Sequence, residues 1–345
     1  MSFKWSEVKR PVYVLAPMAN ITTLPFRSIC KEMGADIVFT PMFSSNAIIH
    51  NPKATLKLAA FLPFEQPVIV QIFGYDGELI AQAANIVQSK LHPAGIDINM
   101  GCPAPKITGN ECGSGLLRNY DKALEIMKHV RANYTGQLSV KIRLGWAQND
   151  VKQFVKQLYD IGIDAITIHG RTAKEGYKGL ADWDAISDIA QDIPLPIIGN
   201  GDITTWQEAI IRAENANLMG VMIGRGALGN PWIFKEIKEH SEVNNKQLAV
   251  NPPTVISTRA EKSLSHNPKG SLQQGRDDKQ ELRRVIKKQA ELSIKQLVDE
   301  KLAMRELRKH LGWYIKGFPG ASELRKEAVQ IDTYEDLGKV LEKLT

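Results

Sequence analysis

The chain has 345 residues, of which 43% are hydrophobic, and a formal net charge of +6. This length suits a barrel of about 250 residues followed by a further domain. The sequence shows neither a hydrophobic signal region nor a run of about 18 apolar residues, so we expect a cytoplasmic protein without membrane association. The three cysteines are too scattered for a disulfide framework, and no metal-ligand spacing occurs, so we expect no bound metal.

The positive charge is concentrated in the last part of the chain. Residues 246–345 contain 20 lysines and arginines and 14 aspartates and glutamates, while residues 1–245 contain 24 of each kind. A neutral body with a basic tail is typical of a protein that holds a polyanion, although a run of charge is more often a solvated face.

Short apolar runs rich in valine and isoleucine alternate with segments of helical periodicity over residues 11–224. The runs predict strands at Val12–Pro17, Asp36–Thr40, Pro67–Phe73, Gly95–Asn99, Leu138–Leu144, Ala165–His169, Leu195–Asn200 and Gly220–Gly224. Between them the periodicity predicts helices at Leu24–Met33, Glu78–Gln88, Asp121–Ala132, Val151–Ile161 and Thr205–Ala213. Eight strands alternating with helices predict an α/β fold with a closed (β/α)8 TIM barrel over residues 1–243. An open doubly wound sheet is the alternative, which the absence of a G-x-G-x-x-G turn after the first strand disfavours.

The pattern changes after Phe234. Residues 244–280 are polar and show no sustained period, which predicts a linker or insertion that is flexible or takes its order from a partner. From Glu281 an apolar stripe of Leu282, Ile286, Ala290, Ile294 and Leu297 predicts a helix, and Lys301–Trp313 predicts a second. Residues 281–345 should therefore form a small all-helical domain with a basic outer side.

The stretch from Gly95 to Leu117 contains the best candidate for chemistry. Its buried strand runs into Gly101, Cys102 and Pro103, which present the cysteine on an extended backbone at a strand end. A cysteine thiol is mostly protonated at neutral pH, so it can donate a proton. An isolated cysteine is more often a small buried residue, and we expect Cys112, which no strand end or proline positions, to be structural or a loop residue.

In a barrel the working residues lie at the carboxyl ends of the strands. Lys141 lies within the apolar run SVKIRLG, where a lysine is costly without an anionic partner. Glycine turns end the last two strands, where barrels commonly bind a phosphate. A single phosphate site together with Gln71, Lys141 and His169 fits flavin mononucleotide, FMN. The competing interpretations are a surface lysine, a core histidine and an ordinary Gly-Asn-Gly turn.

These residues resemble the tRNA-dihydrouridine synthase family, and the chain is most similar to the bacterial B-type members. The matching stretches run nearly end to end. They are Ala16–Met18, Pro25–Arg27, Val70–Gly74, Asp97–Pro103, Val140–Arg143, His169–Thr172, Ala181–Trp183, Gly199–Ile203, Met222–Gly226, Arg308–His310 and Trp313–Ala321. The combination of Asn99–Pro103 with His169–Thr172 is highly specific, whereas the glycine turns alone are not.

The resemblance implies an oxidoreductase that reduces the C5–C6 double bond of specific uridines in tRNA, with NADPH as the electron donor and Cys102 as the proton donor to C5. It implies an FMN site formed by Pro17, Met18, Ala19, Gln71, Lys141, His169, Asn200, Gly201, Asp202, Gly224 and Arg225. We expect contacts to the uracil and the tRNA from Asn99, Arg143, Arg171, Arg284, Lys287, Lys288, Arg305, Arg308 and Lys309. We also expect the protein to be monomeric.

Two other functions are compatible with parts of this pattern. A small-molecule FMN reductase of the dihydroorotate type would have no use for a basic helical tail, and a non-catalytic tRNA-binding factor would be colourless when purified. The sequence departs from the family at two places: Asn20–Thr23 replaces a more usual Gly-Val/Ile-Thr-Asp, and residues 244–280 look longer than the family's linker.

Overall fold

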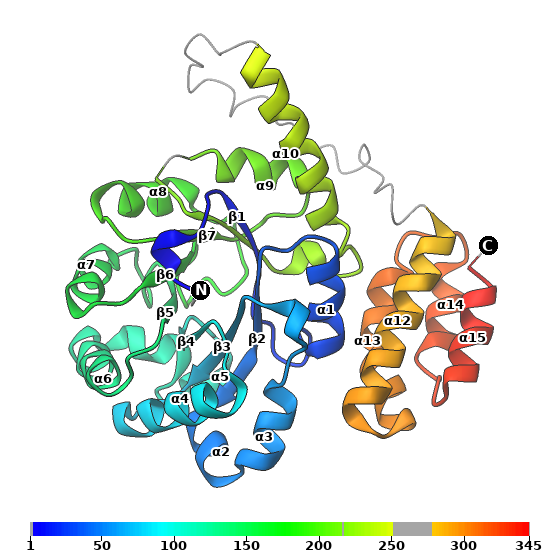
Figure 1. The fold of residues 1–345 in the computed structure, drawn as a ribbon, viewed down its shortest axis with the longest axis horizontal. Helices are drawn as coiled ribbons and strands as arrows, with labels where there is room; N and C mark the ends of the chain where they lie inside the picture. The colour runs from blue at the N-terminus through cyan, green and yellow to red at the C-terminus, as the bar shows by residue number, and fades with distance from the viewer. Residues whose placement is uncertain (1–2, 216, 251–277, 345) are drawn as a thin grey trace. The chain divides into compact units, whose positions relative to one another are not determined.

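In the computed structural model, which describes residues 3–215, 217–250 and 278–344, eight parallel strands close into a barrel in the order β1 to β8 (Figure 1). The strands are almost wholly buried, as expected of a parallel sheet covered by helices. Their bounds are β1 Val12–Leu15, β2 Ile37–Ser44, β3 Val68–Phe73, β4 Gly95–Met100, β5 Leu138–Arg143, β6 Ala165–His169, β7 Ile197–Asn200 and β8 Gly220–Ile223. The predicted (β/α)8 fold is confirmed, with shifted strand ends.

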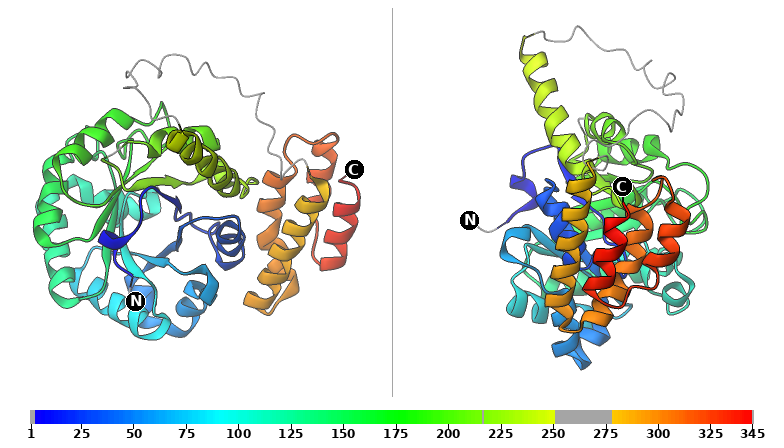
Figure 2. Two further views of the ribbon diagram at one scale, coloured as in Figure 1. Left: turned by 45° about the horizontal axis from the view of Figure 1, so that its top comes forward. Right: turned by 90° about the vertical axis from the view of Figure 1, so that its right-hand side faces the viewer.

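Helices surround the strands as a ring, which Figure 2 shows in its left view. They are α1 Leu24–Glu32, α2 Ser45–His50, α3 Pro52–Ala59, α4 Gly77–Leu91, α5 Pro105–Thr108, α6 Tyr120–Asn133, α7 Lys152–Ile161, α8 Trp183–Asp192 and α9 Trp206–Ala213. Short 3-10 helices are η1 Trp5–Glu7, η2 Pro63–Glu65, η3 Gly113–Arg118 and η4 Arg225–Ala227. The structure contains the five helices that the periodicity predicts. It adds α2, α3, α5 and α8, which the sequence reading missed.

The barrel interior is filled by side chains and closed at its amino-terminal end by a tryptophan. Trp5 is 1% exposed and packs in one cluster with inward-facing residues of the strands, among them Val14, Phe39 and Met222. Its backbone N–H donates to the Gln137 side chain at 2.9 Å. The barrel is therefore closed at this end by apolar packing.

Strand β2 contains an irregularity that directs one side chain toward the end of β4. The register against β3 shifts between Phe39 and Met42, and Pro41, which lies in this interval, has no N–H to donate to a ladder. Beyond the shift, the Met42 sulfur lies 3.5 Å from the amide nitrogen of Asn99. The bulge thus places a soft acceptor beside the predicted site.

The chain forms two compact units, one of Met1–Thr204 with Ile211–Gly226 and one of Thr205–Ile210 with Ala227–Thr345. The second unit contains the helices α10 Ile233–Val250, α12 Lys279–Leu297, α13 Glu300–Tyr314, α14 Ala321–Ala328 and α15 Tyr334–Glu342. The predicted barrel end at residue 243 falls inside α10. That helix also continues into the predicted linker, whose residues 251–277 lie outside the described residues.

Helices α12 and α13 pack on each other in the second unit. The buried stripe of α12 runs through Leu282, Ile286 and Ala290 as predicted, but Ile294 and Leu297 are only partly buried. The stripe stops there because α12 ends at Leu297, before a turn whose Val298 is 79% exposed. Among the described residues, no helix is both long and apolar enough to cross a membrane.

The closure of the barrel between β8 and β1 gives a stability prediction. A Cβ atom added at Gly220 would lie 2.0 Å from the Val12 carbonyl oxygen, so Gly220→Ala must push the two strands apart. We expect it to lower the free energy of unfolding by about 3 kcal/mol or more. Gly338→Ala is the matched control, because nothing lies within 4 Å of that position in α15 and alanine favours a helix by about 0.5–1 kcal/mol. Thermal denaturation followed by circular dichroism should move the two melting temperatures in opposite directions, and a shared direction would contradict the packing described for Gly220.

Candidate active site

Cys102 lies in a turn that is held from both sides. Strand β4 ends at Met100, and the backbone N–H groups of Gly101 and Cys102 both donate to the Asn99 side-chain oxygen, at 3.1 and 2.9 Å. The Cys102 carbonyl oxygen accepts from the Ser114 N–H and from the Ser114 hydroxyl, each at 3.0 Å. The Cys102 side chain is partly exposed, whereas Cys112 is buried. The turn therefore presents one thiol at the mouth of the barrel on a fixed backbone.

The Asn99 side chain belongs to a network buried between β3, β4 and β5. Its amide nitrogen donates to the Gln71 side-chain oxygen at 2.7 Å, and the Gln71 amide nitrogen donates to Asp97 at 2.7 Å. Ser139 donates to the other Asp97 oxygen at 2.7 Å. Burial raises the pKa of Asp97 to about 6, against these two hydrogen bonds and the charge of Lys141. Asp97 is thus mostly ionised at neutral pH.

Lys141 points into the barrel mouth, as its place in the sequence predicts. Its ammonium group donates to the Asn200 side-chain oxygen at 2.9 Å, and Asn200 in turn donates to the Met222 carbonyl oxygen at 2.8 Å. Burial, followed by the charge of Arg143, lowers the pKa of Lys141 to about 8. The hydrogen-bond partner of this cation is neutral, so the site has capacity for an anion.

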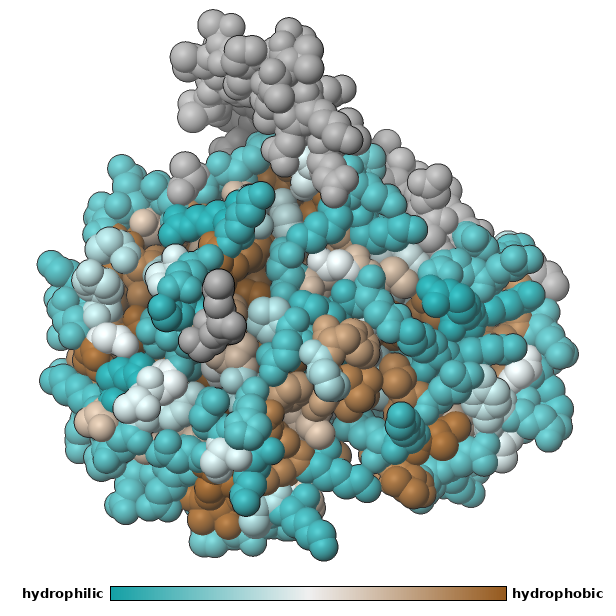
Figure 3. Space-filling view, in the orientation of Figure 1, coloured by the Kyte–Doolittle hydropathy of each residue, from teal (hydrophilic) through white to brown (hydrophobic). Residues whose placement is uncertain are grey.

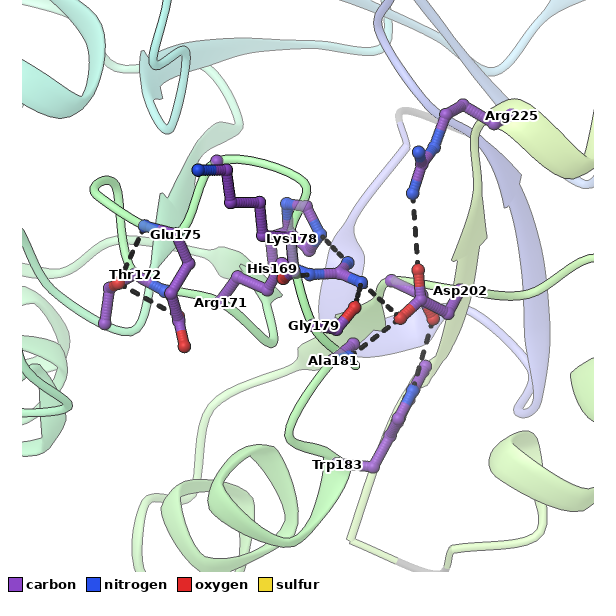
Figure 4. Close-up of polar contacts among 12 residues, drawn as sticks. His169, Arg171, Thr172, Glu175, Lys178, Gly179, Ala181, Trp183, Asp202 and Arg225 are labelled. Atoms are coloured by element: carbon purple, nitrogen blue, oxygen red, sulfur yellow. Dashed lines mark hydrogen bonds and ion pairs between the residues drawn. The ribbon is translucent and has the colours of Figure 1, made fainter.

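Arg143 and Arg171 are each 2% exposed, and their guanidinium groups donate hydrogen bonds to acceptors within the protein. Arg143 donates to the Gly101 carbonyl oxygen at 2.7 Å and to two carbonyl oxygens of the loop between β6 and α8. Arg171 donates to two further carbonyl oxygens of that loop and, at 2.6 Å, to Asp202 (Figure 4). Both arginines hold loops around the turn of Cys102. These internal acceptors could not be foreseen from the sequence, and the expected contacts of Arg143 and Arg171 with the substrate stay a prediction.

His169 lies among cations at the end of β6. Burial and the charges of Lys141, Arg143, Arg171 and Arg225 lower the pKa of His169 to about 2, so the ring is neutral. Its Nε2 atom lies 3.3 Å from an Arg171 nitrogen, which can only donate, so Nε2 accepts and the ring proton belongs on Nδ1. A neutral His169 cannot act as a general acid near neutral pH.

The turns after β7 and β8 bring backbone donors to the same end of the barrel. Gly201 has φ 132°, and a Cβ atom there would lie 2.5 Å from that of Ala181. The Asp202 carboxylate accepts hydrogen bonds from Arg171, from the Ala181 N–H and from Arg225 (Figure 4). It therefore holds these three groups in place around the turn. Among the described residues, no acceptor is assigned to the backbone N–H groups that follow β7 and β8, at Gly201, Asp202, Gly224 and Arg225.

The turn after β1 approaches the end of β8. A Cβ atom added at Gly224 would lie 3.6 Å from that of Ala16 and 3.8 Å from the Met18 sulfur, so Pro17, Met18 and Ala19 lie on a segment beside the Gly224 turn. Asn20 has φ 57°, a conformation that glycine and asparagine tolerate best. The departure from the family's usual glycine is therefore compatible with the same local backbone.

The predicted basic surface of the tail is only partly available. The face of the helical unit drawn in Figure 3 is mostly hydrophilic. Lys287 and Arg305 are exposed, and Arg305 lies 3.6 Å from Asp332. Arg308, in contrast, donates to Asp332 at 2.7 Å and to the Ile331 carbonyl oxygen. In the remaining three cases, Arg284 pairs with Glu281, Lys309 pairs with Glu306, and Lys288 is partly buried.

Sequence reasoning missed Asp97, Ser114, Ser139 and Tyr177 as parts of this region. The signal for Asp97 was present, because a charged residue inside the buried run GIDIN needs a partner. Tyr177 is 60% exposed, and the guanidinium groups of Arg143 and Arg225 lie 5.5 and 4.8 Å from its ring centre. Ser114 and Ser139 carried no signal, since their roles follow from contacts across strands and loops.

Comparison with known proteins agrees with the sequence resemblance. The family model described as dihydrouridine synthase matches residues 14–345. The chain belongs to the dihydrouridine synthase family. A probable tRNA-dihydrouridine synthase of Aquifex aeolicus is 39% identical over 70% of this chain and 76% of its own length. The tRNA-dihydrouridine synthase B of Pseudomonas syringae is 33% identical over 90% of this chain and 85% of its own length.

Among solved structures, a histamine dehydrogenase from Rhizobium sp. 4-9 superposes with a TM-score of 0.51. It shares 14% sequence identity, and the match covers 66% of this chain and 45% of that one. At this identity the likeness shows only a shared barrel fold. The dihydrouridine synthase assignment rests on the family model and the sequence relatives.

The lowered pKa of Lys141 predicts a pH-dependent stability. Because the folded protein releases this proton near pH 8 and the unfolded chain near 10.5, the cost of burying the charge is full below pH 8 and disappears as the pH rises to 10.5. Lys141→Gln should therefore stabilise ligand-free protein at pH 7 by up to roughly 3 kcal/mol, and this gain should shrink between pH 8 and 10. Urea denaturation at several pH values measures the difference, with exposed Lys287→Gln as the control. A gain that stays constant with pH would show that the Lys141 charge is not penalised in the fold.

Proposed function

We propose that this dihydrouridine synthase reduces the C5–C6 double bond of specific uridines in tRNA, with bound FMN and with NADPH as the electron donor. The observation that most supports this proposal is the juxtaposition at one end of the barrel of an anchored, partly exposed Cys102 and a partly buried Lys141 whose hydrogen-bond partner is neutral. This reduction requires an acid that protonates the uracil carbon atom and a positive charge that stabilises the reduced flavin.

The residues at the strand ends fit FMN. Lys141 supplies a partly buried positive charge, and the backbone N–H groups at Gly201, Asp202, Gly224 and Arg225 suit a phosphate. Gln71 keeps one amide hydrogen beyond its bond to Asp97, which suits an acceptor on a ring edge. We assign Pro17, Met18, Ala19, His169 and Asn200 to the walls of this site. When bound, FMN supplies the hydride that adds to C6 of the uracil.

Cys102 donates the proton to C5 in this proposal. Its thiol is the acid on the turn, since the neutral His169 is unsuitable and Cys112 is buried. Charge that develops on the uracil during reduction lies close to the cations of the barrel mouth, which stabilise it. Arg143 and Arg171 keep the surrounding loops in place through their bonds to backbone carbonyl oxygens. A uridine of folded tRNA must leave its stack to enter such a site.

The helical unit binds the tRNA backbone in this proposal. Its exposed cations Lys287 and Arg305 suit phosphate contacts. Arg284 and Lys309 can add contacts when they leave their glutamate partners, and the partly buried Lys288 can add one more. Arg308 instead stabilises the unit by joining α13 to the segment before α15. The division of tasks is therefore chemistry in the barrel and phosphate binding in the tail.

Comparison of the two cysteines near the site tests the assignment of the acid. Cys102→Ala protein should be yellow, release FMN on denaturation and accept electrons from NADPH, because the flavin site is intact. Its uridine reduction should fall by about 10²- to 10⁴-fold, as expected for loss of a positioned acid. Cys112→Ala is the control and should cost far less. Equal losses in both variants, measured as dihydrouridine formed in tRNA by mass spectrometry, would reject Cys102 as the acid, and a colourless parent protein that gains no FMN would reject the cofactor.

Salt dependence of tRNA binding tests the tail. A Lys287→Ala and Arg305→Ala double variant should lower the slope of log affinity against log salt by roughly 0.7–0.9 for each phosphate that is no longer neutralised. Arg308→Ala is the comparison, because we expect it to lower the melting temperature of the helical unit through loss of its bonds to Asp332 and Ile331. If the double variant binds tRNA with the parent's affinity and salt slope, these cations form an ordinary solvated face.

A further inference from the structure

We infer that Asp97 is a positioning residue, whose carboxylate sets the direction of a chain of hydrogen bonds that ends on the backbone of Cys102. The chain, called here the Asp97 chain, consists of Asp97, Gln71, Asn99 and the N–H groups of Gly101 and Cys102. The inference deepens the proposed function and rests on it, since the position of Cys102 matters most if its thiol donates the proton.

The two inner links of the Asp97 chain are short and buried. Asp97 is fully buried and Gln71 is 1% exposed. The bonds from Gln71 to Asp97 and from Asn99 to Gln71 are each 2.7 Å long. The last link spans the turn, where the Asn99 oxygen accepts from the Cys102 N–H at 2.9 Å. The buried carboxylate of Asp97 is thus joined to the Cys102 backbone without a gap.

The direction of the chain is fixed by its buried end. An ionised carboxylate can only accept, so Gln71 must turn its amide nitrogen to Asp97 and its oxygen to Asn99. Asn99 must then turn its nitrogen to Gln71 and its oxygen to the turn. If Asn99 were reversed, its NH2 group would face the N–H donors of Gly101 and Cys102, and the turn would lose its acceptor. The raised pKa of Asp97, about 6, still leaves the carboxylate mostly ionised at pH 7.

In this arrangement the nitrogen and the oxygen of the Asn99 side chain already have all their hydrogen-bond partners. Its nitrogen donates to Gln71 and lies 3.5 Å from the Met42 sulfur, and its oxygen accepts two backbone N–H groups. Asn99 therefore acts through the turn. Ser139 also bonds Asp97, but a hydroxyl can donate or accept, so Ser139 does not determine the direction.

Three variants separate direction from charge and from packing. Asp97→Leu removes the acceptor and should lower kcat for uridine reduction by about 10²-fold with little change in KM for tRNA, since misplacement by about 1 Å costs that much. Asp97→Asn should restore kcat to within about tenfold of the parent, because its oxygen can face Gln71 while its NH2 group faces the Ser139 hydroxyl. Ser139→Ala should keep the parent's kcat. Asp97→Ala, which also removes the carboxylate, replaces Asp97→Leu if that variant does not fold.

A second readout requires neither tRNA nor turnover. The rate at which iodoacetamide alkylates Cys102, followed by peptide mass spectrometry on flavin-loaded protein, should change about threefold or more in Asp97→Leu and remain near the parent's in Asp97→Asn and Ser139→Ala. Folded Asp97→Leu protein with the parent's kcat and alkylation rate would overturn the inference, as would Asp97→Asn behaving like Asp97→Leu. A parent protein that alkylates as described but reduces no uridine would refute the proposed function and leave the Asp97 chain standing.

Discussion

The side-chain oxygen of Asn99 accepts the two N–H groups of the turn that carries Cys102, and the order of the site depends on this bond. Without it, two backbone donors at the barrel mouth would lack a partner, and the direction of the thiol would depend on the bonds that Ser114 and Arg143 make to carbonyl oxygens of the turn. The bond is itself oriented by groups deeper in the barrel. The polar interior of β3, β4 and β5 thus determines the position of the Cys102 turn at the surface. A rigid barrel suits such a turn because it keeps these interior groups in place.

The charge at the carboxyl ends of the strands is unbalanced, which lowers stability and favours the binding of an anion. Burial lowers the pKa of Lys141 and that of His169, so the fold holds one lysine at a cost and keeps the histidine neutral. Asp202 offsets part of the positive charge by pairing with Arg171 and Arg225. An anionic ligand relieves the remaining cost, which links binding energy to the stability of this end of the barrel.

The sequence was sufficient for the eight strands, for the inward position of Lys141 and for the place of Cys102 at a strand end, because each follows from local periodicity. Helix α8 was missed although its signal was readable: Asp182 caps the helix by accepting from the Ala185 N–H, and Trp183, Ile186 and Ile189 follow on one face. The bonds of Asp97 to Gln71 and of Arg308 to Asp332 were not predictable, because they join residues 26 and 24 positions apart whose meeting depends on strand register and helix packing.

The most direct test of the account is the dihydrouridine content of tRNA in cells that lack this gene. Mass spectrometry of each tRNA should show that at least one position carries uridine in the deletion strain and dihydrouridine again when the intact gene is returned. Such a result would connect the barrel site to its proposed substrate and identify the uridine. If every dihydrouridine persists at parental levels in a strain without any other member of the family, the chain does not reduce tRNA uridines and the proposed function is wrong.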